Sequence, residues 1–145
     1  MKTKTFLLLV IFLGIGLTQL SAQAGTTGKG TVVDRYAWDG YSLPVYCNGV
    51  QIDNLQGSVS VLEIVHYGKN GEWAWATHIC SGTVASTSGS GEVFMIKELD
   101  KKYENGAPTQ DIVVIAVGNH RTHYVLTFIF DTSTYELIPE KSICH

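Results

Sequence analysis

Alternation of apolar and polar side chains is the clearest pattern in this chain after its first two dozen residues. Residues 58–67 and 73–80 both alternate between two side-chain faces. In the second segment one face carries Trp73, Trp75, Thr77 and Ile79, and the other carries Ala74, Ala76, His78 and Cys80. A period of two is typical of a β-strand and not of a helix. The turn formers at 69–72 therefore predict a β-hairpin between the two segments.

Short apolar or alternating segments predict further strands along the chain. They cover residues 31–36, 42–47, 50–53, 92–99, 111–117, 123–131 and 135–138. Asp39-Gly40 and residues 54–57 predict turns, and Asn48-Gly49 predicts the tightest hairpin because both residues tolerate positive φ. Pro44 lacks a donor for the strand ladder, so the strand around it is expected at a sheet edge.

Two polar segments are expected to lie between strands. Residues 81–91 are rich in Ser, Thr and Gly, which predicts a flexible loop or a twisted edge strand. Residues 100–106 have room for one helical turn, but they carry too few apolar side chains for a buried helix. The pattern therefore predicts a single all-β domain over residues 25–145, either an antiparallel sandwich or an eight-stranded barrel, and leaves both open.

The first residues have the pattern of a secretory signal peptide. Lys2 and Lys4 precede an apolar run over residues 6–17, and small residues at Ala22 and Ala24 follow at the spacing that signal peptidase recognises. We therefore expect residues 1–24 to be a cleavable signal peptide and residues 25–30 to be a flexible N-terminus. The mature protein is expected to be secreted or periplasmic, without a transmembrane segment after cleavage.

Three cysteines predict one disulfide and one free thiol, because an exported protein meets an oxidising compartment. Three pairings are possible among Cys47, Cys80 and Cys144. We favour Cys47 with Cys144, since Cys47 lies beside a predicted turn and Cys144 lies in a tail with little else to hold it. Cys80 then becomes an ordinary buried thiol.

Charge argues against nucleic acid as a partner. The formal net charge of the whole chain is −3. Removal of the two lysines of the leader leaves eight basic and thirteen acidic side chains, a net charge of about −5. The remaining Lys and Arg are scattered and form no phosphate-binding stripe. No cofactor motif is present, so no cofactor is expected.

Aromatic side chains are the best indication of ligand binding. Trp38, Tyr41, Trp73 and Trp75 lie in the first half of the domain. Large aromatic side chains often fill a β core. They also form flat surfaces that meet a sugar or a protein partner, and they line cavities that hold one small apolar ligand.

Metal binding and catalysis are weaker hypotheses. His66, His78 and Cys80 form a speculative metal site, although no C-x-x-C or H-E-x-x-H spacing is present. His78 with Cys80 also has the composition of a Cys-His nucleophile pair. Acidic residues that could form a carboxylate pair are Glu63, Glu72, Glu92, Glu98 and Asp111.

These observations favour an exported, non-enzymatic β domain that binds an unidentified ligand or protein partner in the envelope or outside the cell. One alternative is a lipocalin-like barrel that carries a small hydrophobic ligand. Another is a small hydrolase or isomerase that uses His78 with Cys80, or a carboxylate pair.

Overall fold

The structure, a computed structural model, describes residues 30–145. The predicted signal peptide over 1–24 and most of the predicted flexible segment over 25–30 lie outside the described residues; Gly30, the last residue of that segment, begins the first strand. The strands are β1 (Gly30–Cys47), β2 (Val50–Tyr67), β3 (Trp73–Ser86), β4 (Val93–Asp100), β5 (Tyr103–Glu104), β6 (Thr109–Gly118), β7 (His123–Asp131) and β8 (Glu136–Cys144). In this part of the chain no helix has the length and apolar content to cross a membrane.

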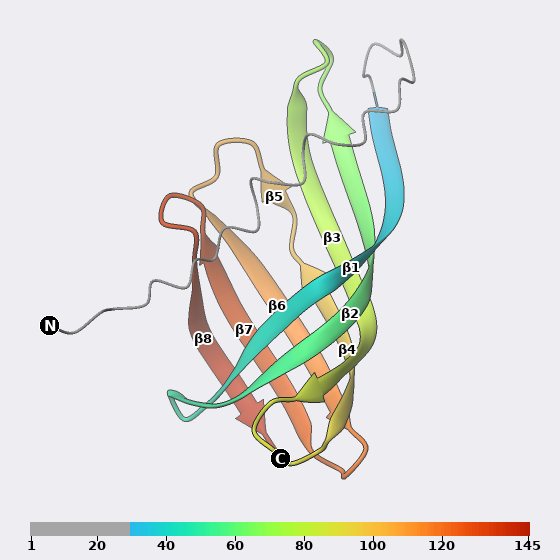
Figure 1. The fold of residues 1–145 in the computed structure, drawn as a ribbon. Helices are drawn as coiled ribbons and strands as arrows, with labels where there is room; N and C mark the ends of the chain where they lie inside the picture. Colours follow the sequence, from blue (N-terminus) through green and yellow to red (C-terminus); the bar gives the residue numbers. More distant parts are fainter. Residues whose placement is uncertain (1–29) are drawn as a thin grey trace, which may run out of the picture.

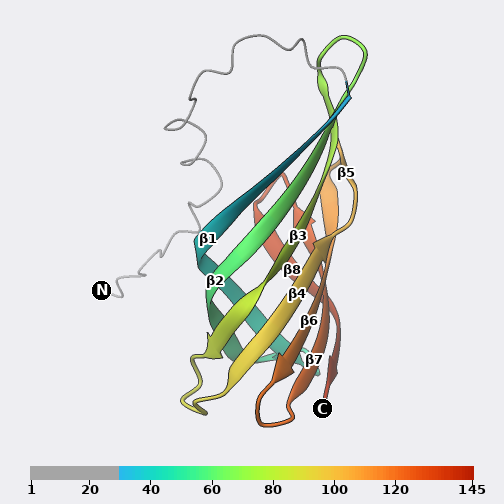
Figure 2. The same ribbon diagram turned by 90° about the vertical axis from the view of Figure 1, so that its right-hand side faces the viewer.

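All eight strands belong to one antiparallel sheet with the order β1-β2-β3-β4-β6-β7-β8, and β5 pairs with the first residues of β3. The all-β prediction is confirmed, but the sandwich and the closed barrel are both wrong. The sheet coils so strongly that β1 and β2 cross in front of β6 and β7 (Figures 1 and 2). One continuous sheet thus supplies both walls of the core, and its ladder stays open.

The first two strands are much longer than the pattern predicts. Asp39-Gly40 does not reverse the chain but lies at a register shift between Trp38 and Tyr41, and β1 continues beyond it. Residues 54–57 likewise remain in β2 and pair with both neighbouring strands. Turn-forming residues permit a reversal of the chain without requiring one. At Asp39-Gly40 the strand continues through a bulge, and residues 54–57 pair with β1 without a register shift. The Asn48-Gly49 hairpin is confirmed, with φ values of 53° and 78°.

Three other segments differ from the prediction. Residues 81–86 extend β3, the expected helical turn at 100–106 contains the short strand β5, and β8 runs on to Cys144. Each segment has weak local strand preference, and each is held in the sheet by a neighbouring strand. Pro44 lies on β1, which is an edge strand as predicted.

The core lies between the two halves of the coiled sheet. Its largest fully buried side chains are Phe94, Phe128, Leu55, Leu126, Val45, Val84 and Val114. Strand β4 shows the alternation most clearly, because Phe94, Ile96, Glu98 and Asp100 are buried while their neighbours are exposed. Two carboxylates thus occupy positions that the strand pattern assigns to the core.

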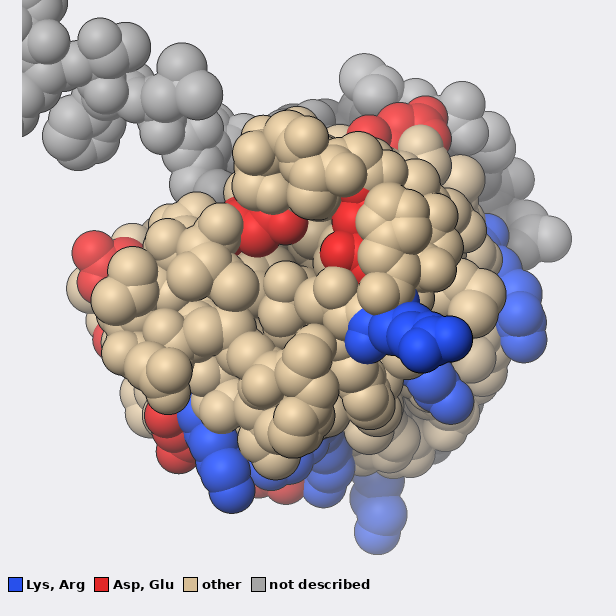
Figure 3. Space-filling model, turned by 90° about the horizontal axis from the view of Figure 1, so that it is seen from below, with Lys and Arg blue, Asp and Glu red and all other residues tan. Residues whose placement is uncertain are grey.

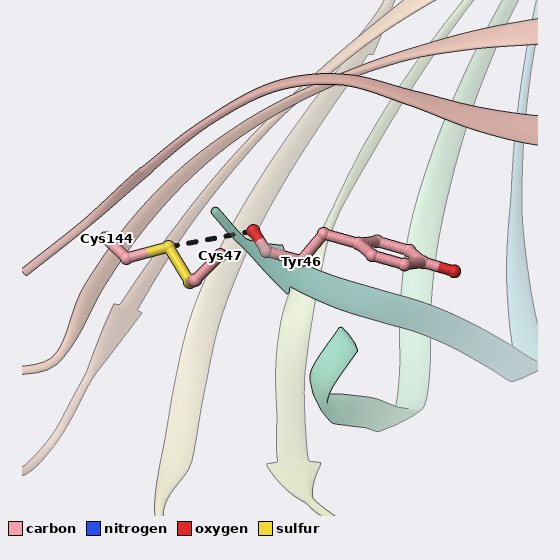
Figure 4. Close-up of a disulfide and its surroundings, with 3 residues drawn as sticks. All are labelled: Tyr46, Cys47 and Cys144. Carbon is pink, nitrogen blue, oxygen red and sulfur yellow. Dashed lines mark hydrogen bonds between the residues drawn. A yellow bond between two sulfur atoms is a disulfide. The ribbon is translucent and has the colours of Figure 1, made fainter. Parts of the chain in front are cut away.

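A disulfide joins the first and last strands of the sheet. Cys47 at the end of β1 bonds to Cys144 at the end of β8, across a sequence separation of 97 residues (Figure 4). The Cys144 sulfur also lies 3.7 Å from the carbonyl oxygen of Tyr46. The predicted pairing is confirmed, and Cys80 is the free, buried thiol. The disulfide is consistent with an oxidising, extracytoplasmic location.

Two glycines allow β2 and β3 to approach closely where the sheet coils. A Cβ atom on Gly57 would lie 2.8 Å from the carbonyl oxygen of Thr83, and one on Gly82 would lie 2.6 Å from the carbonyl oxygen of Ser58. Both obstacles are backbone atoms, which cannot move without disturbing the ladder. The coil of the sheet therefore depends on the absence of side chains at these positions.

We expect Gly82→Ala to lower the free energy of unfolding by about 1–3 kcal/mol, since the added methyl group forces apart two paired strands. Urea unfolding followed by circular dichroism measures this change. Ser81→Ala, at an exposed position beside it, is the matched control and should change stability by less than about 0.5 kcal/mol. Equal stability of the two variants would contradict the role assigned to Gly82.

Candidate functional site

Polar side chains from four neighbouring strands gather on the inner face of the sheet. Asp34 of β1 pairs with Glu63 of β2, and Glu63 pairs with His78 of β3. Residues that pair directly across an antiparallel ladder share a face. Glu98 and Asp100 of β4 occupy the same inner face beside them, since Glu98 pairs with Cys80. We call Asp34, Glu63, His78, Glu98 and Asp100 the inner acidic cluster.

His78 lies between two carboxylates. Its Nε2 is 2.9 Å from Glu63 Oε1, and its Nδ1 is 3.3 Å from Asp100 Oδ2. Only the doubly protonated ring can donate from both nitrogens at once. The hydrogen bond to Asp100 is the main reason that the pKa of His78 is raised, and it outweighs the lowering effect of burial. When it is protonated, His78 therefore links Glu63 to Asp100.

Glu98 is a buried carboxyl group with an unusually high pKa. The side chain accepts a hydrogen bond of 2.5 Å from the Tyr41 hydroxyl. Burial, and then the charge of Asp100, raise the pKa of Glu98 to about 7, although the bond from Tyr41 opposes the shift. Near neutral pH this group therefore exchanges between its neutral and charged forms.

Two buried polar atoms in the described residues have no hydrogen-bond partner: Asp100 Oδ1 and Gln110 Nε2. Asp100 is only 9% exposed. Gln110 lies on β6 two residues before Ile112, which pairs with Asp100. The two side chains are therefore diagonal neighbours on the inner face, about 7–8 Å apart at their Cα atoms. Unpaired buried polar atoms are costly and rare. A bound molecule that donates a hydrogen bond to Asp100 Oδ1 and accepts one from Gln110 Nε2 would remove this cost.

Aromatic side chains border the cluster. Tyr36 lies two residues after Asp34 on the same face of β1. Its pKa is raised, first by burial and then by the charge of Glu63. Towards the β2–β3 hairpin, the register puts three aromatic residues on the same inner face. We call them the aromatic wall: Tyr67, Trp73 and Tyr103. The Trp73 and Tyr103 rings are 5.3 Å apart. In Figure 2 this end of β1, β2 and β3 projects beyond β6, β7 and β8.

Of the four aromatic residues singled out in the sequence, Trp38 and Tyr41 form a contact, whereas Trp73 and Trp75 lie on opposite faces. Trp38 and Tyr41 contact each other at 5.6 Å, and Tyr41 is only 3% exposed. Trp73 pairs with Tyr67, whereas Trp75 pairs with His66 across a register shift. Because Tyr67 and His66 are consecutive, Trp73 and Trp75 lie on opposite faces. Simple alternation predicts that Trp73 and Trp75 share a face, but the bulge between them places them on different faces.

The structure does not bring the three speculative metal ligands together. His78 and Cys80 share the inner face, but His66 lies on the outer face, where it stacks on Trp75 and contacts the Thr31 hydroxyl. Within residues 30–145 no group of three or more His, Cys, Asp or Glu side chains has the arrangement of a metal site.

His78 and Cys80 do not form an activated nucleophile pair. Both ring nitrogens of His78 are taken by carboxylates. Burial and the charge of Glu98 raise the pKa of Cys80, so the thiol stays protonated.

Of the five acidic residues considered for a carboxylate pair, Glu63 and Glu98 lie in the cluster and the other three do not. Glu72 lies in the turn between β2 and β3. Asp111 pairs with Lys101 at 3.1 Å, and Glu92 accepts hydrogen bonds from the turn that joins β6 to β7.

Sequence reasoning missed Asp34, Tyr36, Asp100 and Gln110. A signal was available for Asp100, because Glu98 and Asp100 stand at the apolar positions of the alternating segment that becomes β4. No comparable signal marks Gln110, because its position beside Asp100 depends on the register between β4 and β6.

Figure 3 shows the lower end of the molecule, with acidic side chains on both sides of a hollow and lysine and arginine side chains around the margin. Two carboxylates outside the inner acidic cluster, one on β2 and one in the loop before β4, are already hydrogen-bonded. Asp53 accepts hydrogen bonds from the Ser86 hydroxyl and the Thr87 amide, and Glu92 accepts one from the Thr122 hydroxyl. These groups stabilise turns, so the inner acidic cluster remains the candidate site. No protein-family model, curated protein or solved structure matches this chain.

Proposed function

We propose that this protein is an exported, non-enzymatic β domain that binds a ligand or a protein partner at the inner acidic cluster. The observation that carries the proposal is the unpaired Oδ1 atom of Asp100, a buried side chain beside the apolar core. Burial of ionisable groups lowers stability unless they are fully paired. Incompletely paired groups of this kind concentrate at functional sites.

Several features favour binding over catalysis. The thiol of Cys80 is protonated and the imidazole of His78 is held by two carboxylates, so neither is poised for attack on a substrate. Glu98 with Asp100 has the character of a proton donor beside a base. However, Glu98 already accepts a hydrogen bond from the Tyr41 hydroxyl, so one of its oxygen atoms is engaged within the protein.

The packed interior also favours this site over a lipocalin-like cavity. Phe94, Phe128 and Leu126 are each 1% exposed and fill the space between the two halves of the sheet. The hollow lined by Tyr46, Leu126, Phe128 and Lys141 lies at the seam between β1, β7 and β8, away from the cluster. An exported location is supported by the disulfide and by the predicted leader.

We expect a ligand screen to yield compounds whose binding depends on Asp100. Tryptophan fluorescence and thermal shift would be measured against sugars, lipids, amines and extracts of the native extracellular medium. Asp100→Asn should weaken every genuine hit at least about tenfold, because it removes a charge-assisted partner. Asp111→Asn, on an exposed side chain outside the cluster, is the matched control. Hits that are equally strong in both variants, or complete silence, would contradict the proposal.

A further inference from the structure

We propose that the inner acidic cluster binds a small organic cation, a primary ammonium group carried on an aromatic body, through the unpaired oxygen of Asp100. This inference rests on the proposed function and names its ligand class. It combines the charge of the cluster, the two unpaired polar atoms and the aromatic wall.

The charge of the cluster selects a cation. Four carboxyl groups face a single imidazole, and no Lys or Arg of the described residues forms an ion pair with any of them. Arg35 follows Asp34 along β1, but its pairing with Leu62 places it on the opposite face. A partly buried site with this excess of negative charge attracts cations and repels anions.

The unpaired oxygen of Asp100 favours a ligand group that donates hydrogen bonds. Asp100 Oδ1 is a buried acceptor, and an ammonium group would give it a charge-assisted hydrogen bond. Glu98 lies two residues away on the same strand face and adds a second carboxyl group. The unpaired Gln110 Nε2 can donate to an oxygen atom next to the ammonium group. An amino alcohol would therefore use both unpaired atoms.

The aromatic side chains near the cluster favour a ligand that carries an aromatic ring. Tyr36 follows Asp34 by two residues on the same strand face, so an aromatic ring adjoins the carboxylates and can contact a cation. The next positions on the inner face are Val65 and Ala76, followed by the aromatic wall. A ligand with its ammonium group at Asp100 would lay its apolar part along this surface. A bare metal ion or a methylammonium ion would leave that surface unused.

The test is isothermal titration calorimetry of the purified protein with three compounds of similar shape. These are phenethylamine, 2-amino-1-phenylethanol and the neutral 2-phenylethanol. We expect phenethylamine to bind at least about tenfold more tightly than 2-phenylethanol, and the amino alcohol to bind more tightly still. Gln110→Leu should remove the advantage of the amino alcohol and leave phenethylamine unchanged.

Variants on either side of the site locate the binding. Asp100→Asn should weaken phenethylamine at least about tenfold, and Asp111→Asn should leave it unchanged. Glu63→Gln, at a more exposed position, is a second test in case Asp100→Asn disturbs the fold, which circular dichroism would reveal. Trp73→Ala should weaken phenethylamine but have little effect on methylamine, because only the larger compound reaches the aromatic wall.

Affinity should also rise with pH. The groups that face the bound cation are Asp34, Tyr36, Glu63, His78, Cys80, Glu98 and Asp100. Between pH 6 and pH 8 Glu98 loses its proton, which should strengthen phenethylamine binding by up to about tenfold. Glu98→Gln should remove most of that rise.

The outcomes separate this inference from the proposed function. Equal binding of phenethylamine and 2-phenylethanol, or tight binding of an anion that depends on Asp100, would show that the site binds ligands of another class. The inference would then be wrong while the binding function stands. If no amine binds and the wider ligand screen is also silent, the inference and the proposed function are both wrong. Ordered water would then be the only partner of Asp100 Oδ1.

Discussion

Loss of the Cys47–Cys144 disulfide should lower the free energy of unfolding by about 4–5 kcal/mol. The bond spans 97 residues, and in the chain-entropy model a link of this length strongly restricts the unfolded chain. It also joins β1 to β8, which are not neighbours in the hydrogen-bonded order of the sheet. The total stability of a domain is typically about 5–15 kcal/mol, so the reduced protein should be marginally folded.

Urea unfolding of a Cys47→Ser, Cys144→Ser double variant measures this effect and leaves the buried Cys80 in place. Dithiothreitol should shift the wild-type midpoint toward that of the variant. The same reagent should leave the double variant unchanged, which controls for effects on Cys80. Identical midpoints for the oxidised protein and the variant would mean that packing between the sheet ends, and not the disulfide, holds the coil.

The stability of this protein should fall by about 2.5 kcal/mol as the pH rises from 5 to 8, because of Glu98. The folded pKa of Glu98 is about 7, above its usual value of 4.5. A carboxyl group with a raised folded pKa binds its proton more tightly in the folded state, so its contribution is present at low pH and is lost between about pH 4.5 and 7. His78 acts in the same direction, since its raised folded pKa gives stability that is lost as the pH rises through that value.

Urea unfolding at pH 5, 6, 7 and 8 would measure the trend. In Glu98→Gln the pH dependence should shrink to the part that His78 contributes. Glu140→Gln, at an exposed position on β8, should keep the wild-type dependence. A wild-type protein that is equally stable at pH 5 and pH 8 would show that Glu98 reaches solvent and has no raised pKa.

The site shows where sequence reasoning reached its limit. His78, Cys80, Glu63 and Glu98 were recognised as titratable residues on alternating segments, and they do lie on one face of neighbouring strands. Their grouping depended on registers between segments up to several dozen residues apart, which no local pattern contains. The place of Trp73 was missed for the same reason, because one bulge at the end of β3 moves it to the opposite face from Trp75.

The chain by itself determined the features that depend on neighbouring residues. A period of two set which side chains share a face, Asn48-Gly49 set a hairpin, and three cysteines behind a predicted leader favoured one disulfide. Only the tertiary structure decided that Asp39-Gly40 is a bulge, that β2 and β3 coil closely at Gly57 and Gly82, and that one open sheet forms both walls of the core. The physical reason is that the energy of pairing and burial is shared among distant strands. The coil also brings Tyr41 of β1 onto Glu98 of β4, a contact between residues 57 positions apart in the chain.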